Sequence, residues 1–236
     1  MTQNYVKKEL NKLLKDINEE SVVGKAIKIY QKIDNDIDIK HKRRCPPKCN
    51  ICCSDYFYIS FAELLTIYFW VQEHNKQHRL VQKEYIPISI NMLKQIEQLA
   101  PKEYQYLMYI NRLLKEHHTF QSNSPSQEIF TIPCCFLNNK GKCSIYPVRP
   151  MICRFFGYCK QCDCEHLNQH SNWLYNPFSY FPREIINSHL WNQSFPLSVG
   201  FSLEVYFDYF FEKKLLDAIN LNIFDFDTKY FPKRST

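Results

Sequence analysis

The chain has 236 residues, of which 45% are hydrophobic and 16% aromatic, and its formal net charge is +6. A chain this long and apolar can bury a core of its own, which sets it apart from short zinc fingers that fold only around their ion. The longest strongly apolar stretch, residues 57–71, is interrupted by Ser60 and Glu63 and is too short to cross a bilayer. We therefore expect no membrane span.

The N-terminal residues 1–14 alternate lysine, asparagine and glutamate with leucine, and they lack the continuous apolar stretch of a signal peptide. This pattern favours a cytoplasmic protein.

Positive charge is dense only in residues 40–44, directly before Cys45. Because a centre of four thiolates and one divalent ion carries a net charge of about −2, we interpret these cations first as a solvated, charge-balancing face. An acidic partner is the next alternative, and nucleic acid is the least favoured.

Helical periodicity is found on both sides of the first cysteines. Apolar residues repeat at intervals of three and four within residues 10–30, with Gly24 near a change of phase, which predicts two short helices or one broken helix. Farther on, Ser60 and Glu63 have the spacing of a capping box, in which each side chain accepts a hydrogen bond from a backbone amide. That motif predicts a helix that starts at Ser60 and runs to about residue 74.

The rest of the chain gives two further helical signals and one turn. Apolar residues flank Pro101 at helical spacing within residues 93–114, which predicts a helix that ends before Pro101 and another that has it in the first turn. Residues 138–141, Asn-Asn-Lys-Gly, predict a tight turn inside a small hairpin of residues 136–146. Residues 202–219 are predicted to form a helix with a broad apolar face.

Eleven cysteines fall into two groups, at Cys45, Cys49, Cys52 and Cys53 and at Cys134, Cys135, Cys143, Cys153, Cys159, Cys162 and Cys164. Thiols at such short intervals, in a chain without an export signal, are more typical of a metal site than of a disulfide framework. Metal–sulfur bonds are about 2.3 Å long, so a loop of two or three residues can turn two sulfurs onto one ion. Pro46 and Pro47 restrict the first such loop before any metal binds.

The second group lies far from the first in sequence, so a shared ion would staple the two halves of the chain together. We predict one centre with three ligands from the first group and one from the second, namely Cys45, Cys49 and Cys52 with Cys134, Cys143 or Cys153. Cys53 directly follows another ligand and could serve a second site. The last cysteines form Cys-x-x-Cys-x-Cys-x-His, at Cys159, Cys162, Cys164 and His166. This segment is either an extra metal site, with Cys159 as a candidate ligand, or a redox pair.

Two motifs carry a family resemblance. The first is Cys-x-x-x-Cys-x-x-Cys-Cys from Cys45, followed by a helix with an early glutamate, Glu63; the second runs from Cys134 through Cys143 to Cys153. Over residues 41–160 the chain resembles the YkgJ-type cysteine-cluster family, which is described as a zinc- or iron-chelating domain. The resemblance implies as metal ligands Cys45, Cys49, Cys52, Cys53, Cys134, Cys143 and Cys153, with Arg149-Pro150 and Arg154 as characteristic neighbours. Cys135 stands where that family usually has proline, so we interpret it as a small packing residue.

Zinc and iron both suit tetrahedral thiolate sites, so ligand type leaves zinc, iron and a [4Fe-4S] cluster open as cofactors. The favoured function is a metal-binding cysteine-cluster protein whose site is structural or serves metal handling or electron transfer. One alternative is an iron–sulfur or S-adenosylmethionine-dependent enzyme, since flagellin lysine N-methylase resembles the same family, although no Gly-rich nucleotide loop follows a strand here. Another is a metal-stapled module whose aromatic C-terminal part docks on a protein partner.

For the fold we expect a single domain, residues 1–236, of the mainly α class. In this prediction a helical body surrounds an irregular cysteine-rich metal-binding knot with at most a small β-hairpin. Its parts are an N-terminal helical segment (1–40), the cysteine-cluster core (41–165) and an aromatic-rich helical extension (166–236). Arg149 and Arg154 are expected to donate hydrogen bonds to sulfurs or carbonyl groups around the knot.

Overall fold

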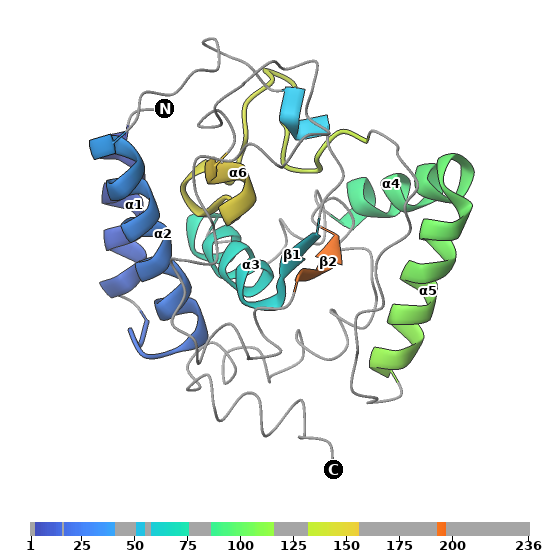
Figure 1. The fold of residues 1–236 in the computed structure, drawn as a ribbon, viewed down its shortest axis with the longest axis horizontal. Coiled ribbons are helices and arrows are strands. Elements are labelled where there is room, and N and C mark those ends of the chain that lie inside the picture. Colours follow the sequence, from blue (N-terminus) through green and yellow to red (C-terminus); the bar gives the residue numbers. More distant parts are fainter. Residues whose placement is uncertain are drawn as a thin grey trace.

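The computed structural model describes residues 3–15, 17–40, 51–54, 58–75, 86–115, 132–155 and 193–196. This part of the chain is mostly helical, which confirms the mainly α prediction for it (Figure 1). The elements in chain order are α1 (Gln3–Lys15), α2 (Val22–Lys40), the 3-10 helix η1 (Ile51–Ser54), β1 (Tyr58–Ser60), α3 (Phe61–Asn75), α4 (Ile86–Leu99), α5 (Pro101–Lys115), the 3-10 helix η3 (Tyr146–Val148), α6 (Met151–Phe155) and β2 (Gln193–Pro196). The helix predicted over residues 202–219 lies outside the described residues.

The N-terminal periodicity corresponds to two helices, α1 and α2, which lie side by side (Figure 1). The chain leaves α1 before Ser21, whose Oγ accepts the Gly24 amide at 3.1 Å and so caps α2. Gly24 therefore lies in the first turn of α2 and not at the break. A Cβ there would meet the Asn18 carbonyl oxygen at 2.4 Å, so only glycine lets this turn pack so closely.

Helix α3 occupies the middle of the molecule (Figure 1). Its start is the predicted capping box: the Glu63 amide donates to Ser60 Oγ at 3.2 Å, and the Ser60 amide donates to Glu63 Oε2 at 2.9 Å. Most of its described side chains are buried, on all sides of the helix, including Leu64, Ile67 and Trp70. A helix that is apolar all round belongs in a core. Accordingly α3 packs against α2 and β1.

Strands β1 and β2 pair antiparallel, with Tyr58 opposite Pro196 and Ile59 opposite Phe195 (Figure 1). The sequence did not predict this pair, which joins distant segments and is therefore not a hairpin. A three-residue strand directly before a helix is too short for an alternating pattern to be recognised. The predicted hairpin is present in reduced form, as a single antiparallel bridge between Leu137 and Cys143.

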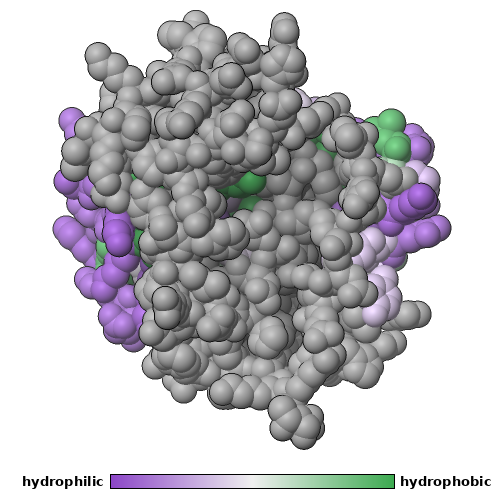
Figure 2. Space-filling model, viewed as in Figure 1, coloured by the Kyte–Doolittle hydropathy of each residue, from purple (hydrophilic) through white to green (hydrophobic). Residues whose placement is uncertain are grey.

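Helices α4 and α5 meet at Ala100, as predicted, with Pro101 at the first position of α5. The two helices pack against each other at one side of the molecule (Figure 1). Leu99, at the end of α4, is 60% exposed although it continues the apolar spacing of that helix. Figure 2 shows apolar surface near this junction and hydrophilic surface along the flanks.

Among the described helices none is both long and apolar enough to cross a membrane.

Candidate metal centre

The end of the first cysteine group lies beside the start of the second. The Cys134 amide donates to the Cys53 carbonyl at 2.7 Å, and the Ile132 amide donates to the Ser54 carbonyl at 2.9 Å. These two hydrogen bonds join the end of η1 to a segment about eighty residues later in the chain. Cys53 and Cys134 are both partly buried. Backbone hydrogen bonds therefore join the last cysteine of the first group to the first cysteine of the second.

Cys143 lies on a short hairpin whose turn follows Cys134 in the chain. The Leu137 amide donates to the Cys134 carbonyl at 2.9 Å, and the Ser144 amide donates to the Phe136 carbonyl at 2.8 Å. Between them Asn138 organises the turn, because its Oδ1 accepts the amides of Lys140 and Lys142, both at 3.0 Å. Gly141 has a φ of 66°, in the left-handed region that glycine adopts without strain. The asparagine and glycine thus bend the chain so that Cys143 lies opposite Leu137.

Cys153 lies in α6, a helix of five residues that Glu63 joins to α3. Glu63 Oε1 accepts the Met151 amide at 2.8 Å, while Oε2 accepts both the amide and the hydroxyl of Ser60, at 2.9 and 2.8 Å. One carboxylate therefore caps the start of α3 and also binds the first residue of α6. The sequence predicted the first of these roles and missed the second.

Glu63 is only 1% exposed. Burial raises the pKa of Glu63 above the ordinary value of a glutamate, because the charged form loses its water. The hydrogen bonds from Ser60 and Met151 and the charge of Arg154 lower this pKa again. Both carboxylate oxygens of Glu63 therefore accept hydrogen bonds from the protein, which fits a structural role.

Arg154, also in α6, is completely buried. Its Nη1 forms an ion pair with Asp34 Oδ2 of α2, its Nη2 donates to the Pro147 carbonyl at 2.5 Å, and its guanidinium lies 4.2 Å from the centre of the Tyr30 ring. Burial lowers the pKa of Arg154, and the neighbouring Asp34 carboxylate opposes that shift. Arg154 therefore anchors α6 to α2.

Tyr30 shares this neighbourhood with Cys153. Burial raises the pKa of Tyr30 well above its ordinary value, and the charges of Glu63 and Cys153 raise it further while that of Arg154 lowers it. Sequence reasoning identified neither Tyr30 nor Asp34 as neighbours of the cysteines. One sequence feature could have indicated Asp34: it comes four residues after Tyr30, and this spacing puts an acid on the apolar face of α2.

Arg149 lies against Tyr146, with its guanidinium 3.9 Å from the ring centre and its Nη1 3.5 Å from the Tyr146 carbonyl oxygen. Together with the bond from Arg154 to Pro147, this confirms that both arginines donate to carbonyl groups of the second motif. Cys135 is buried in the hydrophobic core, as expected for a packing residue. None of the five cysteines whose side chains are described, Cys53, Cys134, Cys135, Cys143 and Cys153, belongs to a disulfide.

The predicted ligand set is only partly within the described residues. The side chains of Cys53, Cys134, Cys143 and Cys153 are described. The side chain of Cys52 is not, and six further candidates lie outside the described residues: Cys45, Cys49, Cys159, Cys162, Cys164 and His166. Among the side chains that the structure describes, no three of histidine, cysteine, aspartate or glutamate are grouped closely enough to hold a metal ion. Convergence of the two groups on one ion therefore stays a prediction.

Comparisons with protein-family models, with curated proteins and with solved structures found no match to this chain.

Proposed function

We propose that this chain is a metal-binding cysteine-cluster protein that holds zinc, iron or an iron–sulfur cluster at a structural, metal-handling or electron-carrying site. The proposed ligands are Cys45, Cys49 and Cys52, with Cys134, Cys143 or Cys153 as the fourth. Thiolates are the donors that zinc and iron–sulfur clusters prefer, so the residue types fit the group.

The observation that carries the proposal is the hydrogen bond from the Cys134 amide to the Cys53 carbonyl at 2.7 Å. A centre with ligands from both groups requires that the end of the first motif and the start of the second be neighbours. Backbone hydrogen bonds hold these two segments next to each other. Metal binding alone therefore does not have to offset the entropy lost when the long intervening loop closes. The resemblance to the YkgJ-type family, which rests on the same cysteine motifs, implies a ligand set that includes these residues.

Metal analysis with a visible absorption spectrum, on protein purified without air, tests the proposal. Iron with sulfide and a brown colour would identify a cluster, and colourless protein with stoichiometric zinc would identify a zinc site. Protein that contains neither metal and takes up neither on reconstitution would contradict the proposal.

The ligand assignment is tested by replacing single cysteines. Cys49→Ser should remove most of the bound metal, because it removes a proposed ligand. Cys135→Ser should keep the metal and cost on the order of 1 kcal/mol of stability, because it alters only a packed thiol in the core. Equal metal content in the two variants would contradict the assignment.

A further inference from the structure

Helix α6 has only five residues, from Met151 to Phe155. Isolated helices shorter than about twelve residues are marginal in water, so α6 keeps its place only through its contacts with the rest of the fold. Two of these contacts involve charged side chains and are made at residues on either side of Cys153. Glu63 binds the amide two residues before it, and Arg154, the next residue, pairs with Asp34.

We propose that Glu63 is a positioning residue for Cys153: its bond to the Met151 amide sets the distance between the second cysteine motif and the chain that follows the first. This inference rests on the proposed function and takes Cys153, among the three alternatives named there, as the fourth ligand. Glu63 stands in the first turn of α3, which follows directly on β1 and comes after η1 in the chain. The carboxylate therefore connects the chain after Cys53 with the helix that carries Cys153.

The geometry of Glu63 supports this role over helix capping alone. Capping α3 uses only Oε2, which accepts both hydrogen bonds from Ser60. Oε1 is directed to a residue 88 positions away in the sequence, across the buried interior. Glutamate has the length to reach both groups, whereas aspartate in the same position could cap the helix but would fall short of α6 by about one carbon–carbon bond, roughly 1.5 Å.

The first test is Glu63→Asp, with Glu103→Asp as the matched control. Glu103 is also a buried glutamate, 1% exposed, in the first turn of a helix, but α5 carries no cysteine. We expect Glu63→Asp to weaken zinc binding about 10- to 100-fold in competition with a chelator, as is typical when a group that orients a ligand is changed. Glu103→Asp should bind zinc as the wild type does.

A second pair of variants changes the other side of the same hydrogen bond and leaves Glu63 and its cap intact. Met151→Pro removes the amide hydrogen at the first position of α6, where proline is tolerated, and Met151→Ala removes the same side-chain packing but keeps the amide. Zinc binding should be weaker in Met151→Pro than in Met151→Ala. Equal affinities would overturn the proposal even if Glu63→Asp were too unstable to measure.

A double-variant comparison separates positioning from general destabilisation. If Glu63 acts through Cys153, then adding Glu63→Asp to Cys153→Ser should weaken zinc binding no further than Cys153→Ser does alone. A further loss of the same size as in the wild-type background would show that Glu63 acts through the fold as a whole, and it would overturn the proposal.

Hydrogen exchange of the Met151 amide gives a readout that needs no metal. We expect protection in the wild type and in Ser60→Ala, and its loss in Glu63→Asp. If the wild type binds zinc normally and Glu63→Asp binds it equally well, only this inference fails. If the wild type binds neither zinc nor iron, the proposed function fails and the inference fails with it, whatever the exchange shows.

Discussion

Arg154 and Glu63 are charged side chains in a hydrophobic core, and each is held there by specific polar contacts. Moving an unpaired charge out of water costs several kcal/mol, so such residues are retained only where hydrogen bonds and an opposite charge replace the water. Arg154 has Asp34, the Pro147 carbonyl and the Tyr30 ring as neighbours. Glu63 has the two amides and the hydroxyl described above. Both residues connect α6 to the helices around it.

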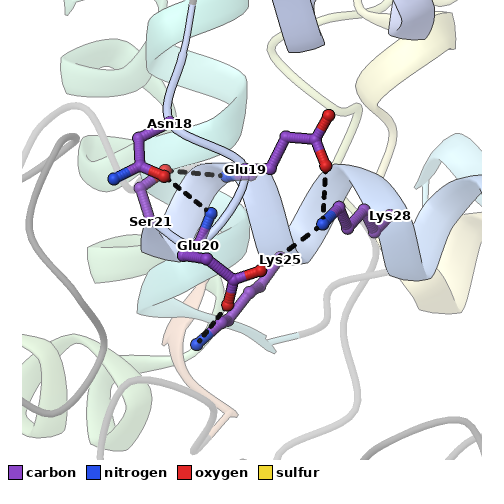
Figure 3. Close-up of polar contacts among 7 residues, drawn as sticks. Asn18, Glu19, Glu20, Ser21, Lys25 and Lys28 are labelled. Carbon is purple, nitrogen blue, oxygen red and sulfur yellow. Dashed lines mark hydrogen bonds and ion pairs between the residues drawn. The ribbon is translucent and has the colours of Figure 1, made fainter.

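Removing Asp34 should therefore be far more damaging than removing a surface acid. Asp34→Asn leaves the Arg154 guanidinium buried without its counter-charge, and we expect a loss of about 3 to 5 kcal/mol in the free energy of unfolding. The control is Glu19→Gln, which breaks the ion pair with Lys28 at 2.8 Å (Figure 3). Those side chains are 60% and 42% exposed, so the cost should stay below about 1 kcal/mol. Urea denaturation of the two variants measures the difference, and similar losses would contradict this account of Arg154.

At the scale of elements, the short pieces around the cysteines depend on side chains and turns more than on their own propensity. The hairpin that carries Cys143 has a single bridge, and its turn is formed by Asn138 and Gly141. Asn138 accepts two amides inside the turn, and glycine supplies the positive φ. By contrast the long helices follow from periodicity and caps that are visible in the sequence.

The conformation of Gly141 leads to a graded prediction. Alanine at a φ of 66° is strained, and Gly141→Ala should cost about 1 to 2 kcal/mol of stability. Gly141→Asn should cost clearly less, because asparagine adopts the left-handed region several times more often than other residues with a side chain. Thermal unfolding of the two variants would rank them, and the reverse order would show that space around the residue matters more than its backbone angle.

At the scale of the molecule, one hydrophobic cluster joins α1, α2 and α3 with the hairpin and α6. The buried side chains of these first three helices are aliphatic and aromatic for the most part. Cys135 belongs to the cluster, and Cys134, Cys143 and Cys153 pack against it. The helical core therefore has apolar burial of its own to stabilise it, in addition to whatever a metal contributes.

This arrangement predicts what metal removal will do. A strong chelator should lower the melting temperature, because the binding free energy of a thiolate site adds to the stability of the folded state. Most of the far-ultraviolet helical signal should persist at room temperature, since α1, α2 and α3 pack through apolar side chains. Collapse of the helical signal on chelation would mean that the fold depends on the metal as a zinc finger does.

Local signals in the sequence determined the helical class, the capping box at Ser60 and Glu63, the helix boundary at Pro101 and the turn at residues 138–141, whereas the packing role of Cys135 was inferred from the family resemblance. These features depend on interactions between residues a few positions apart, which periodicity and caps record directly. Only the tertiary structure decided the contacts between distant segments. They include the pairing of β1 with β2, the bond from Glu63 to the Met151 amide and the ion pair of Arg154 with Asp34. Nothing in a local pattern specifies which distant residue will meet a buried charge, because that choice is made by the packing of the whole core.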